Sequence, residues 1–425
     1  MTAINRYYRL MESLAEKIKY CRICDSTELQ NIVDFGDMSL TGVFLEDGKK
    51  VPTAPLCLIR CKTCGLVQLA HNYDQNSLYG DSYGYESHLN SSMVTHLKRK
   101  ARVLEEKWLP SKEEHTVVDI ASNDGTLLSG YRGEKITRIG IDPLIDVVSN
   151  FYPKNSIKIA DFFSSKLFFD LGTKPADLVT SLSVIYDLHS PVDFARQVHE
   201  ILSEGGIWHF EQSYLPLMLE TSSYDTVCHE HLLYLSLADI KNILNASGFQ
   251  IVDVSLNNTN GGSIAVTAKK SKLELAMPPF ANYLLQQERN SGLTNGTRIE
   301  NFAEKYKNHA IELQTLLSEY SSCGYEVVGV GASTKGNVLL QAAGIDSSLI
   351  RVIGEINPRK FGKQTPGSSI PIVPESAVLD RNPENTLAVV LPWHFRENLL
   401  PKFENYIRLG GSVLFPLPRI EVVSY

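Results

Sequence analysis

The chain has 425 residues, of which 48 are acidic and 41 basic, so its formal net charge is −7 at pH 7. At about 150 residues per domain, this length predicts two or three domains with enough core to fold without disulfides. The acidic balance argues against a nucleic-acid partner held by bulk positive charge. No apolar run approaches the roughly 18 residues of a membrane helix, and no signal-peptide core is visible. We expect a cytoplasmic protein without a membrane partner; the sequence does not indicate its oligomeric state.

Two CxxC pairs lie near the N-terminus, Cys21 with Cys24 and Cys61 with Cys64. An odd total of seven cysteines and the lack of a secretion signal oppose a disulfide framework. Two such pairs can turn four thiolates toward one ion and close a tetrahedral zinc site, which is structural in character. Buried cysteines or a redox CxxC are the alternatives. We predict a Zn²⁺ ion that stabilises a lobe over residues 1–75.

The middle of the chain alternates short apolar runs with helical patterns. A helix is expected where Phe194, Val198, Ile201 and Leu202 share one face. Strands alternating with helices imply a mostly parallel sheet covered on both faces. The expected strands span residues 116–120, 138–142, 177–184 and 207–211.

After a polar helical stretch at residues 278–322, the pattern of strands and helices returns. We therefore predict an α/β protein with a central domain at 76–275 and a second, smaller α/β domain at 276–425. The strands expected in this last part span residues 326–330, 349–356, 386–391 and 412–415.

Small and acidic residues follow three strands of the central domain. Ligands of such sheets bind in the crevice at the carboxyl ends of the strands. An acid after the second strand can accept both ribose hydroxyls of a nucleoside, and a ring after the third can lie near an adenine. A dinucleotide fingerprint GxGxxG is missing from the sequence. The candidate nucleoside-binding residues are Asp119, Ala121, Asn123, Asp124 and Gly125 after the first strand, Asp142 after the second, and Asp161 and Phe162 after the third.

The segments VVDIASNDGTLL, GIDP and ADFF resemble the S-adenosylmethionine (SAM) sites of class I methyltransferases. The CxxC pairs, SYGYESHLNSSM, EQSYL, CHEHLLYLS, NNTNGGSI, GVGASTKGNVLLQ, TPGSSIPI and LPWHF follow in an order similar to the sugar C-methyltransferase family. That family methylates carbon 3 of nucleotide-activated 4-keto-deoxysugars in antibiotic and lipopolysaccharide pathways. The resemblance implies a class I SAM methyltransferase domain with a Rossmann-like sheet, flanked by a four-cysteine zinc lobe and a second Rossmann-like domain. It also implies SAM as cofactor and a nucleotide-diphospho-4-keto-6-deoxysugar as substrate.

Methylation of a carbon beside a ketone requires a base for the proton and donors for the enolate oxygen. The neighbouring titratable groups of His229, Glu230 and His231 could tune an imidazole for this task. From the residues alone, a buried histidine satisfied by a carboxylate is the alternative. The resemblance implies that His231 is the base, that Glu230 assists it and that His229 supports them. Tyr83 or Tyr85 could donate to the sugar, or could pack between lobes.

Two positions depart from well-known members of the family. Cys228 stands where those members often have a tyrosine, two residues before the catalytic glutamate. The stretch at residues 186–188, Tyr-Asp-Leu, replaces a CHI-type sequence whose histidine is functional. His189 is either a substitute or a surface residue. These departures bear on proton transfer and on the stereochemistry of the product.

A glycine-rich loop in the C-terminal domain lies where a strand should turn into a helix. Backbone N–H groups there, with Ser333, Thr334 and Lys335 beyond Gly331, suit an anion such as a diphosphate. Because the lysine precedes the last glycine, the loop is not a P-loop; a structural glycine turn is the alternative. Trp393 either walls this pocket or packs between domains. The sequence does not identify the nucleotide, and an O- or N-methyltransferase or a zinc adaptor remains as an alternative function.

Overall fold

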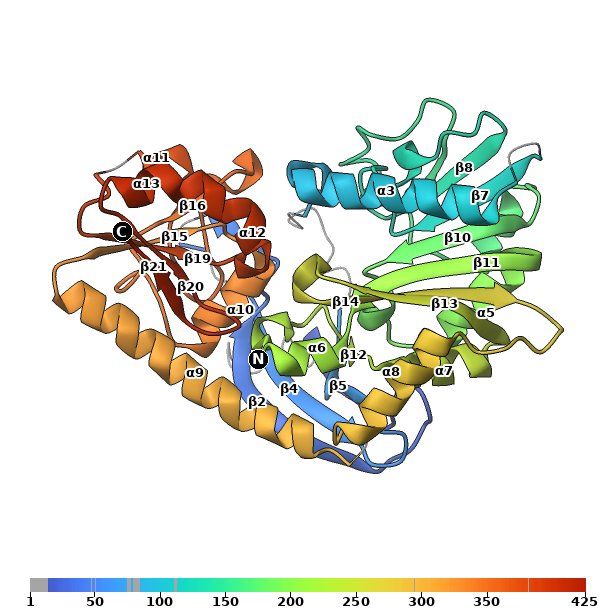
Figure 1. Ribbon diagram of the computed structural model, residues 1–425, viewed down its shortest axis with the longest axis horizontal. Coiled ribbons are helices and arrows are strands. Elements are labelled where there is room, and N and C mark those ends of the chain that lie inside the picture. Colours follow the sequence, from blue (N-terminus) through green and yellow to red (C-terminus); the bar gives the residue numbers. More distant parts are fainter. Residues whose placement is uncertain are drawn as a thin grey trace, which may run out of the picture.

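The computed structural model describes residues 14–46, 48–49, 51–74, 78, 85–110, 113–293, 295–380 and 382–425. Two α/β bodies stand side by side, and strands from the N-terminal part lie between and below them (Figure 1). The predicted α/β architecture is confirmed. Tyr83, one of the two tyrosines considered above, lies outside the described residues.

The N-terminal part forms an antiparallel sheet of four strands in the order β12-β5-β4-β2. Its edge strand β12 comes from far along the chain, because Leu233 and Tyr234 pair with Gln68 and Val67. This pairing attaches the central domain to the N-terminal lobe. The strands are β2 (Leu29–Ser39), β4 (Thr53–Cys61), β5 (Val67–Leu69) and β12 (Leu233–Tyr234), with the small pairs β1 (Ala15–Lys17) and β6 (His71–Tyr73), and β3 (Leu45–Glu46) and β17 (Lys363–Gln364).

The central sheet has seven strands in the order β13-β14-β11-β10-β7-β8-β9. The five strands from β11 to β9 are parallel, as predicted, and β14 is antiparallel to both β11 and β13. The expected helix is α5, which buries Phe194, Val198 and Ile201. The elements are α3 (Ser91–Trp108), β7 (His115–Ile120), β8 (Ile136–Ile141), β9 (Ile157–Ile159), α4 (Ser165–Asp170), β10 (Ala176–Leu182), α5 (Pro191–Ile201), β11 (Leu202–Ser213), α6 (Leu215–Glu220), α7 (Leu237–Ala246), β13 (Phe249–Asn257) and β14 (Ser263–Lys270).

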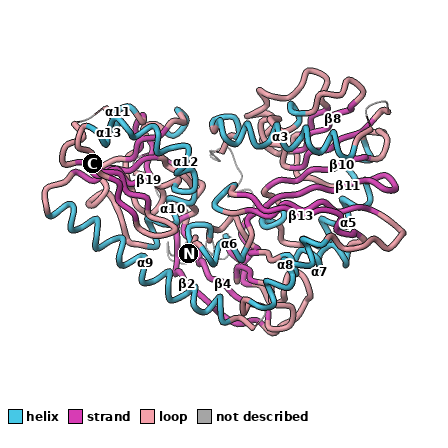
Figure 2. The backbone as a smooth tube through the Cα atoms, in the orientation of Figure 1, coloured by secondary structure: helices cyan, strands magenta, loops and turns pink. Residues whose placement is uncertain are grey.

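The C-terminal sheet has six strands in the order β18-β16-β15-β19-β20-β21, parallel except at β21. In Figure 2 its strands are drawn in magenta around β19, with helices in cyan beside them. The strand predicted at 349–356 is shorter, because the amides of Leu349 and Ile350 bond back to Asp346 in a turn. The elements are α8 (Pro279–Asn290), α9 (Thr297–Ser322), β15 (Glu326–Val330), α10 (Thr334–Ala342), β16 (Ile353–Glu355), β18 (Ile372–Pro374), α11 (Ser376–Leu379), β19 (Thr386–Val390), α12 (Arg396–Leu399), α13 (Glu404–Arg408), β20 (Ser412–Phe415) and β21 (Glu421–Val423).

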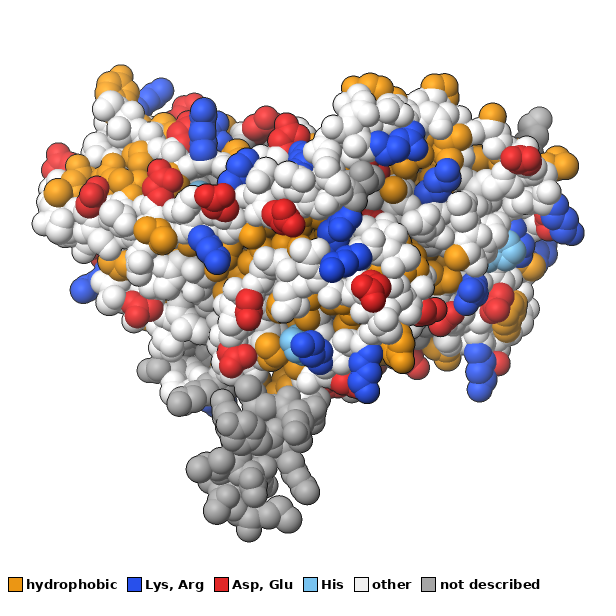
Figure 3. All heavy atoms as spheres, turned by 90° about the horizontal axis from the view of Figure 1, so that it is seen from below, with side chains coloured by type: hydrophobic (Ala, Val, Ile, Leu, Met, Phe, Trp, Pro, Cys, Tyr) orange, Lys and Arg blue, Asp and Glu red, His pale blue; other side chains and the backbone are white. Residues whose placement is uncertain are grey.

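The long helix α9 reaches from the C-terminal sheet to β2 of the N-terminal sheet (Figure 1). Phe35 of β2 contacts Tyr306 of α9 with ring centroids 4.6 Å apart. Among the helices of the described residues, none combines the length and the apolar character that crossing a bilayer requires. On the face seen in Figure 3, Lys and Arg side chains are interspersed with Asp and Glu.

Glu288 of α8 attaches the linker between the two α/β bodies to the central domain. Its carboxylate accepts hydrogen bonds from the Tyr214 hydroxyl at 2.6 Å and from the amides of Leu237 and Ala238 at 2.6 and 3.0 Å. These amides belong to the first turn of α7, where an acceptor satisfies donors that have no partner within the helix. Glu288 is therefore a buried acceptor for three donors.

We expect Glu288→Gln to lower the free energy of unfolding by about 1–3 kcal/mol, because the amide nitrogen would face a donor. Urea denaturation followed by circular dichroism measures this change. Glu312→Gln is the matched control, since Glu312 is an exposed residue on α9. Equal stability of the two variants would contradict the role of Glu288.

Candidate active site

A cavity of about 540 Å³ lies at the carboxyl ends of the central strands and extends to the C-terminal domain. Residues from both α/β bodies and from the segment after α6 line it. Of the residues predicted from the sequence, the cavity is lined by Tyr85, Asp119, Ala121, Asn123, Asp142, Asp161, Phe162, Glu230, His231, Ser333, Thr334 and Lys335. Asp124, Gly125, His229, Gly331 and Trp393 are not among its lining residues.

Asp142, after β8, organises the end of the cavity expected to hold a nucleoside. Its carboxylate accepts the amide of Asn123 at 2.9 Å and the amide of Leu144 at 2.7 Å. A carboxylate has about four acceptor positions, so Asp142 retains capacity for ribose hydroxyls. Asp161 and the partly exposed ring of Phe162 line the same end. These residues fit an adenosyl group.

Asp119, at the end of β7, is almost fully buried. Thr180 donates its hydroxyl to the Asp119 carboxylate at 2.6 Å. Burial raises the pKa of Asp119 to about 7, with neighbouring acidic groups adding to the effect and the Thr180 bond opposing it. Near neutral pH this carboxyl can therefore act as donor as well as acceptor toward a ligand.

Asp124 and Gly125 serve the loop itself. The Asp124 carboxylate accepts the amides of His88 and Thr126 at 2.8 and 3.0 Å, and its distance to the His88 Nδ1 is 3.0 Å. Gly125 has φ of +83°, and a Cβ there would lie 2.5 Å from the Tyr152 ring. Both residues hold the loop after β7 against its neighbours, and neither touches the cavity.

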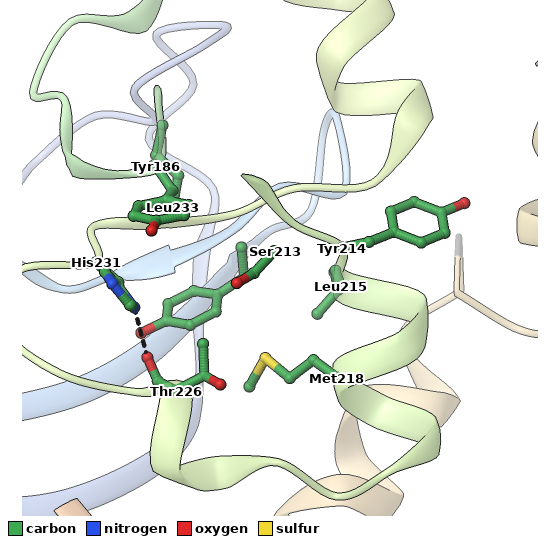
Figure 4. A pocket seen from close by; sticks show the side chains of 9 residues that line it. Tyr186, Ser213, Tyr214, Leu215, Met218, Thr226, His231 and Leu233 are labelled. Atoms are coloured by element: carbon green, nitrogen blue, oxygen red, sulfur yellow. Dashed lines mark hydrogen bonds between the residues drawn. The ribbon is translucent and has the colours of Figure 1, made fainter. Parts of the chain in front are cut away.

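His231 is held in one tautomer by a backbone carbonyl. Its Nδ1 lies 2.8 Å from the oxygen of Thr226, so Nδ1–H donates and Nε2 keeps its lone pair (Figure 4). Nε2 has no hydrogen-bond partner among the described residues. The Tyr186 ring lies 4.3 Å from the imidazole, centroid to centroid. Burial, with a further contribution from the charge of Lys335, lowers the pKa of His231 to about 4.

The triplet at residues 229–231 divides between two environments. Glu230 lines the cavity, accepts the Thr41 hydroxyl at 3.3 Å and has its pKa raised by burial. His229 points the other way: its Nε2 lies 3.1 Å from the carbonyl of Ala54 in β4, and Tyr73 packs edge-on at 4.8 Å. His229 thus fastens the segment to the N-terminal sheet.

Among the described residues, Tyr85 and Tyr186 are the tyrosines that line the cavity. The carbonyl of Tyr85 accepts a hydrogen bond from the Asn123 amide group at 3.2 Å, which ties it to the loop after β7. From the sequence, Tyr186 was noted only as part of the stretch that replaces a CHI-type sequence, and not as a site residue. Its position in the turn at Ile185–Asp187, which follows β10 at the carboxyl end of a central strand, is the signal that could have identified it.

The loop after β15 begins α10 with Ser333 as its N-cap, whose hydroxyl accepts the amide of Gly336 at 3.0 Å. Lys335 is half-buried, and desolvation lowers its pKa; it donates to the carbonyl of Asn260 at 2.6 Å. Lys360 lines the cavity as well. Two lysines and the start of a helix therefore border this end of the cavity.

Gly331 and Trp393 have structural roles. A Cβ on Gly331, whose φ is +83°, would lie 2.6 Å from the Pro392 ring. The indole N–H of Trp393 donates to the buried Asp225 carboxylate at 2.7 Å. Of the two roles predicted for Trp393, the geometry thus favours packing between the domains.

Four cysteine sulfurs converge in the N-terminal lobe. The Sγ atoms of Cys21 and Cys64 are 3.6 Å apart, as are those of Cys24 and Cys61, and all four lie within 4.8 Å of one another. In a tetrahedral site with Zn–S bonds of about 2.3 Å, the sulfurs are about 3.8 Å apart. The predicted cluster is confirmed, and its donor set fits Zn²⁺.

Three family models match successive parts of the chain. One described as "Putative zinc binding domain" matches residues 21–79, and one described as "Methyltransferase domain" matches 91–254. A third, described as "C-methyltransferase C-terminal domain", matches 258–418. Together they account for all three parts of the fold.

The chain is also similar to individual proteins. C-methyltransferase NovU of Streptomyces niveus is 26% identical over 419 residues, which are 97% of this chain and 99% of NovU. Among solved structures, magnesium protoporphyrin IX methyltransferase (ChlM) of Synechocystis PCC 6803 with bound SAH matches 43% of this chain and 88% of its own, at 14% identity and TM-score 0.32. The CurJ carbon methyltransferase matches 44% of this chain and 57% of its own, at 13% identity and TM-score 0.33. Superpositions this partial carry no argument about the substrate.

We expect one Zn²⁺ per chain in the purified protein and its loss in Cys61→Ser, because a hydroxyl is a much weaker ligand than a thiolate. The variant should also melt at a lower temperature. Inductively coupled plasma mass spectrometry and calorimetry measure the two effects. Cys323→Ser is the control, since Cys323 is exposed and outside the cluster; full zinc content in both variants would contradict the assignment.

Proposed function

The chain belongs to the SAM-dependent C-methyltransferases that join a zinc-binding domain, a methyltransferase domain and a C-terminal C-methyltransferase domain, and from this premise we propose its substrate and mechanism. The proposed acceptor is a nucleotide-diphospho-4-keto-6-deoxysugar, methylated at C3 through an enolate. One observation carries this proposal: His231, with an unpaired Nε2, lines the same cavity as the adenosyl-binding residues and Lys335.

His231 is the proposed base. Its Nε2 takes the proton from C3, the electron pair of that C–H bond forms a C3=C4 double bond in the sugar, and the π pair of the C4 carbonyl moves onto its oxygen, which becomes the enolate oxygen. The Thr226 carbonyl keeps the proton on Nδ1, so the lone pair stays on the nitrogen that faces the substrate. When bound, SAM supplies an electrophilic methyl group, to which C3 then forms its new bond, with S-adenosylhomocysteine as the co-product.

The enolate oxygen needs donors that are in place before the reaction. The Tyr85 hydroxyl and the Lys335 ammonium are the candidates, because both side chains line the cavity with His231. Glu230 is the proposed assistant, and its raised pKa lets it hold or release a proton near the base. In this proposal the keto oxygen bonds to Tyr85 or Lys335, and the C3 proton goes to His231, which Glu230 assists.

The nucleotide end is proposed to lie against the C-terminal domain. Lys335 and Lys360 are half-buried, and desolvation lowers the pKa of both. A diphosphate beside them would restore the preference for the charged form, since an opposite charge favours it. The amides at the start of α10 add further donors for an anion.

The test of this function uses 4-keto-6-deoxysugars linked to TDP, GDP and CDP in deuterated water without SAM. We expect deuterium to replace the C3 proton in one nucleotide series, and SAM to give a product in which methyl replaces that hydrogen. Mass spectrometry and NMR measure both. An O- or N-methyltransferase would methylate without any exchange, and this result would overturn the proposal.

We expect His231→Gln to slow the C3 exchange by roughly 10²- to 10⁴-fold, the usual contribution of a general base. SAM binding, measured by calorimetry, should stay the same. His199→Gln is the matched control, because His199 is on α5 and does not line the cavity. Unchanged exchange in the His231 variant would assign the base elsewhere.

We also expect His231 to be neutral in the ligand-free protein at pH 6. A pKa lowered to about 4 favours the uncharged ring at every pH above that value. Nitrogen NMR of the labelled imidazole, identified by its loss in His231→Gln, measures the charge state. Titration near the ordinary value of about 6.5 would contradict this expectation.

A further inference from the structure

A charged cluster with no assigned task lines the cavity between α3 and β11. The Nε2 of His96 lies 2.6 Å from one carboxylate oxygen of Glu211. The other oxygen accepts from Lys100 at 2.7 Å and from the Asn257 amide at 2.7 Å. His96 and Glu211 both line the cavity, whereas Lys100 lies behind them.

Glu211 is ionised in this cluster, and the positive charge of Lys100 lies beside it. Burial alone would raise the pKa of Glu211, but the hydrogen bond from His96 and the charge of Lys100 lower it to about 2. Lys100 therefore balances an ionised Glu211. Behind the cluster, His209 is 3.3 Å from Lys100, and burial lowers its pKa well below the usual range, so it adds no charge.

Because a carboxylate only accepts, the Nε2 of His96 carries the proton that it donates to Glu211, and Nδ1 is the nitrogen left for a ligand. Nδ1 has no partner among the described residues, and the side chain retains 25% of its exposure. A hydroxyl group of the methyl acceptor fits this nitrogen, because a hydroxyl can both donate and accept a hydrogen bond.

The sheet order separates the cluster from the nucleoside end of the cavity. The acids Asp142 and Asp161 follow β8 and β9, on one side of β7. Glu211 lies on β11, two strands beyond β7 on the other side, and Asn257 ends β13. If SAM lies along this edge of the sheet with its adenosyl group at β8 and β9, the methyl acceptor binds at the end of the cavity near β11.

We propose that His96, oriented by Glu211, forms a hydrogen bond through Nδ1 with the acceptor's hydroxyl next to the methylated carbon. This inference rests on the proposed function. If the keto oxygen at C4 faces Tyr85 and Lys335, the other neighbour of C3 is C2, and its hydroxyl is the donor directed away from them. The enzyme then selects sugars that retain the C2 hydroxyl over 2-deoxy sugars.

The experiment compares TDP-4-keto-6-deoxyglucose with its 2-deoxy counterpart, or the same pair in the nucleotide series that reacts. His96→Gln can keep a donor at the Nε2 position for Glu211 but has no acceptor at the Nδ1 position. His96→Asn has the opposite arrangement and keeps an acceptor near Nδ1. The measured quantities are kcat/KM for both sugars, C3 exchange, and the SAM dissociation constant without acceptor.

We expect wild-type kcat/KM to favour the hydroxylated sugar by roughly 10- to 100-fold, the cost of losing the hydrogen bond between its hydroxyl and His96. His96→Gln should reduce this preference to less than about 3-fold and His96→Asn should retain part of it. Exchange on the 2-deoxy sugar and SAM affinity should stay at wild-type values in both variants.

Three results would overturn the inference. A preference that persists unchanged in His96→Gln would remove His96 from recognition of the hydroxyl. Weakened SAM binding with an unchanged preference would assign Nδ1 to the SAM ammonium. Equal loss of exchange on both sugars would make His96 a base. If the wild-type protein exchanges neither sugar, the proposed function fails first, and this inference fails with it.

Discussion

The candidate site depends on one segment, residues 224–234, which contacts all three parts of the chain. The Asp225 carboxylate binds the Trp393 indole of the C-terminal domain at 2.7 Å. His229 bonds to the carbonyl of Ala54 in the N-terminal sheet, and Leu233 pairs with Gln68 in the same sheet. Between these attachments lies His231, whose ring position is set by Thr226 of the same segment. The proposed base is therefore placed by contacts outside the methyltransferase sheet.

This arrangement gives the zinc cluster a physical connection to the active site. The amide of Cys61 bonds to the carbonyl of Leu66 at 2.9 Å, next to the start of β5. The amide of Leu69, at the end of β5, bonds to the carbonyl of Leu232 at 2.9 Å, one residue after His231. A zinc site closed by four cysteines is structural and performs no chemistry. The zinc site holds the end of β4 beside the start of β5, however, and residues 224–234 are aligned against β5.

The sequence was sufficient to predict what depends on local spacing. Strands that end in Asp119 and Asp142, and cysteines in CxxC pairs, carry their geometry within a few residues. The direction in which a side chain points after a turn does not follow from residue spacing. Spacing therefore did not reveal that Asp124 and His229 form hydrogen bonds with neighbouring backbone groups instead of lining the cavity. The His96–Glu211 pair joins residues 115 positions apart, and no local pattern links them.

The charge states in the cavity explain how the proposed base, His231, can have so low a proton affinity in the ligand-free protein and still act in catalysis. The pKa of His231 is lowered first by burial and then by the positive charge of Lys335. A general base works best when its pKa lies near the working pH. A diphosphate bound beside Lys335 would offset that positive charge, and the pKa of His231 would rise toward neutrality. Binding of the nucleotide end would in this way increase the basicity of the imidazole only when a substrate is in place, while the ligand-free site keeps its lone pair unprotonated.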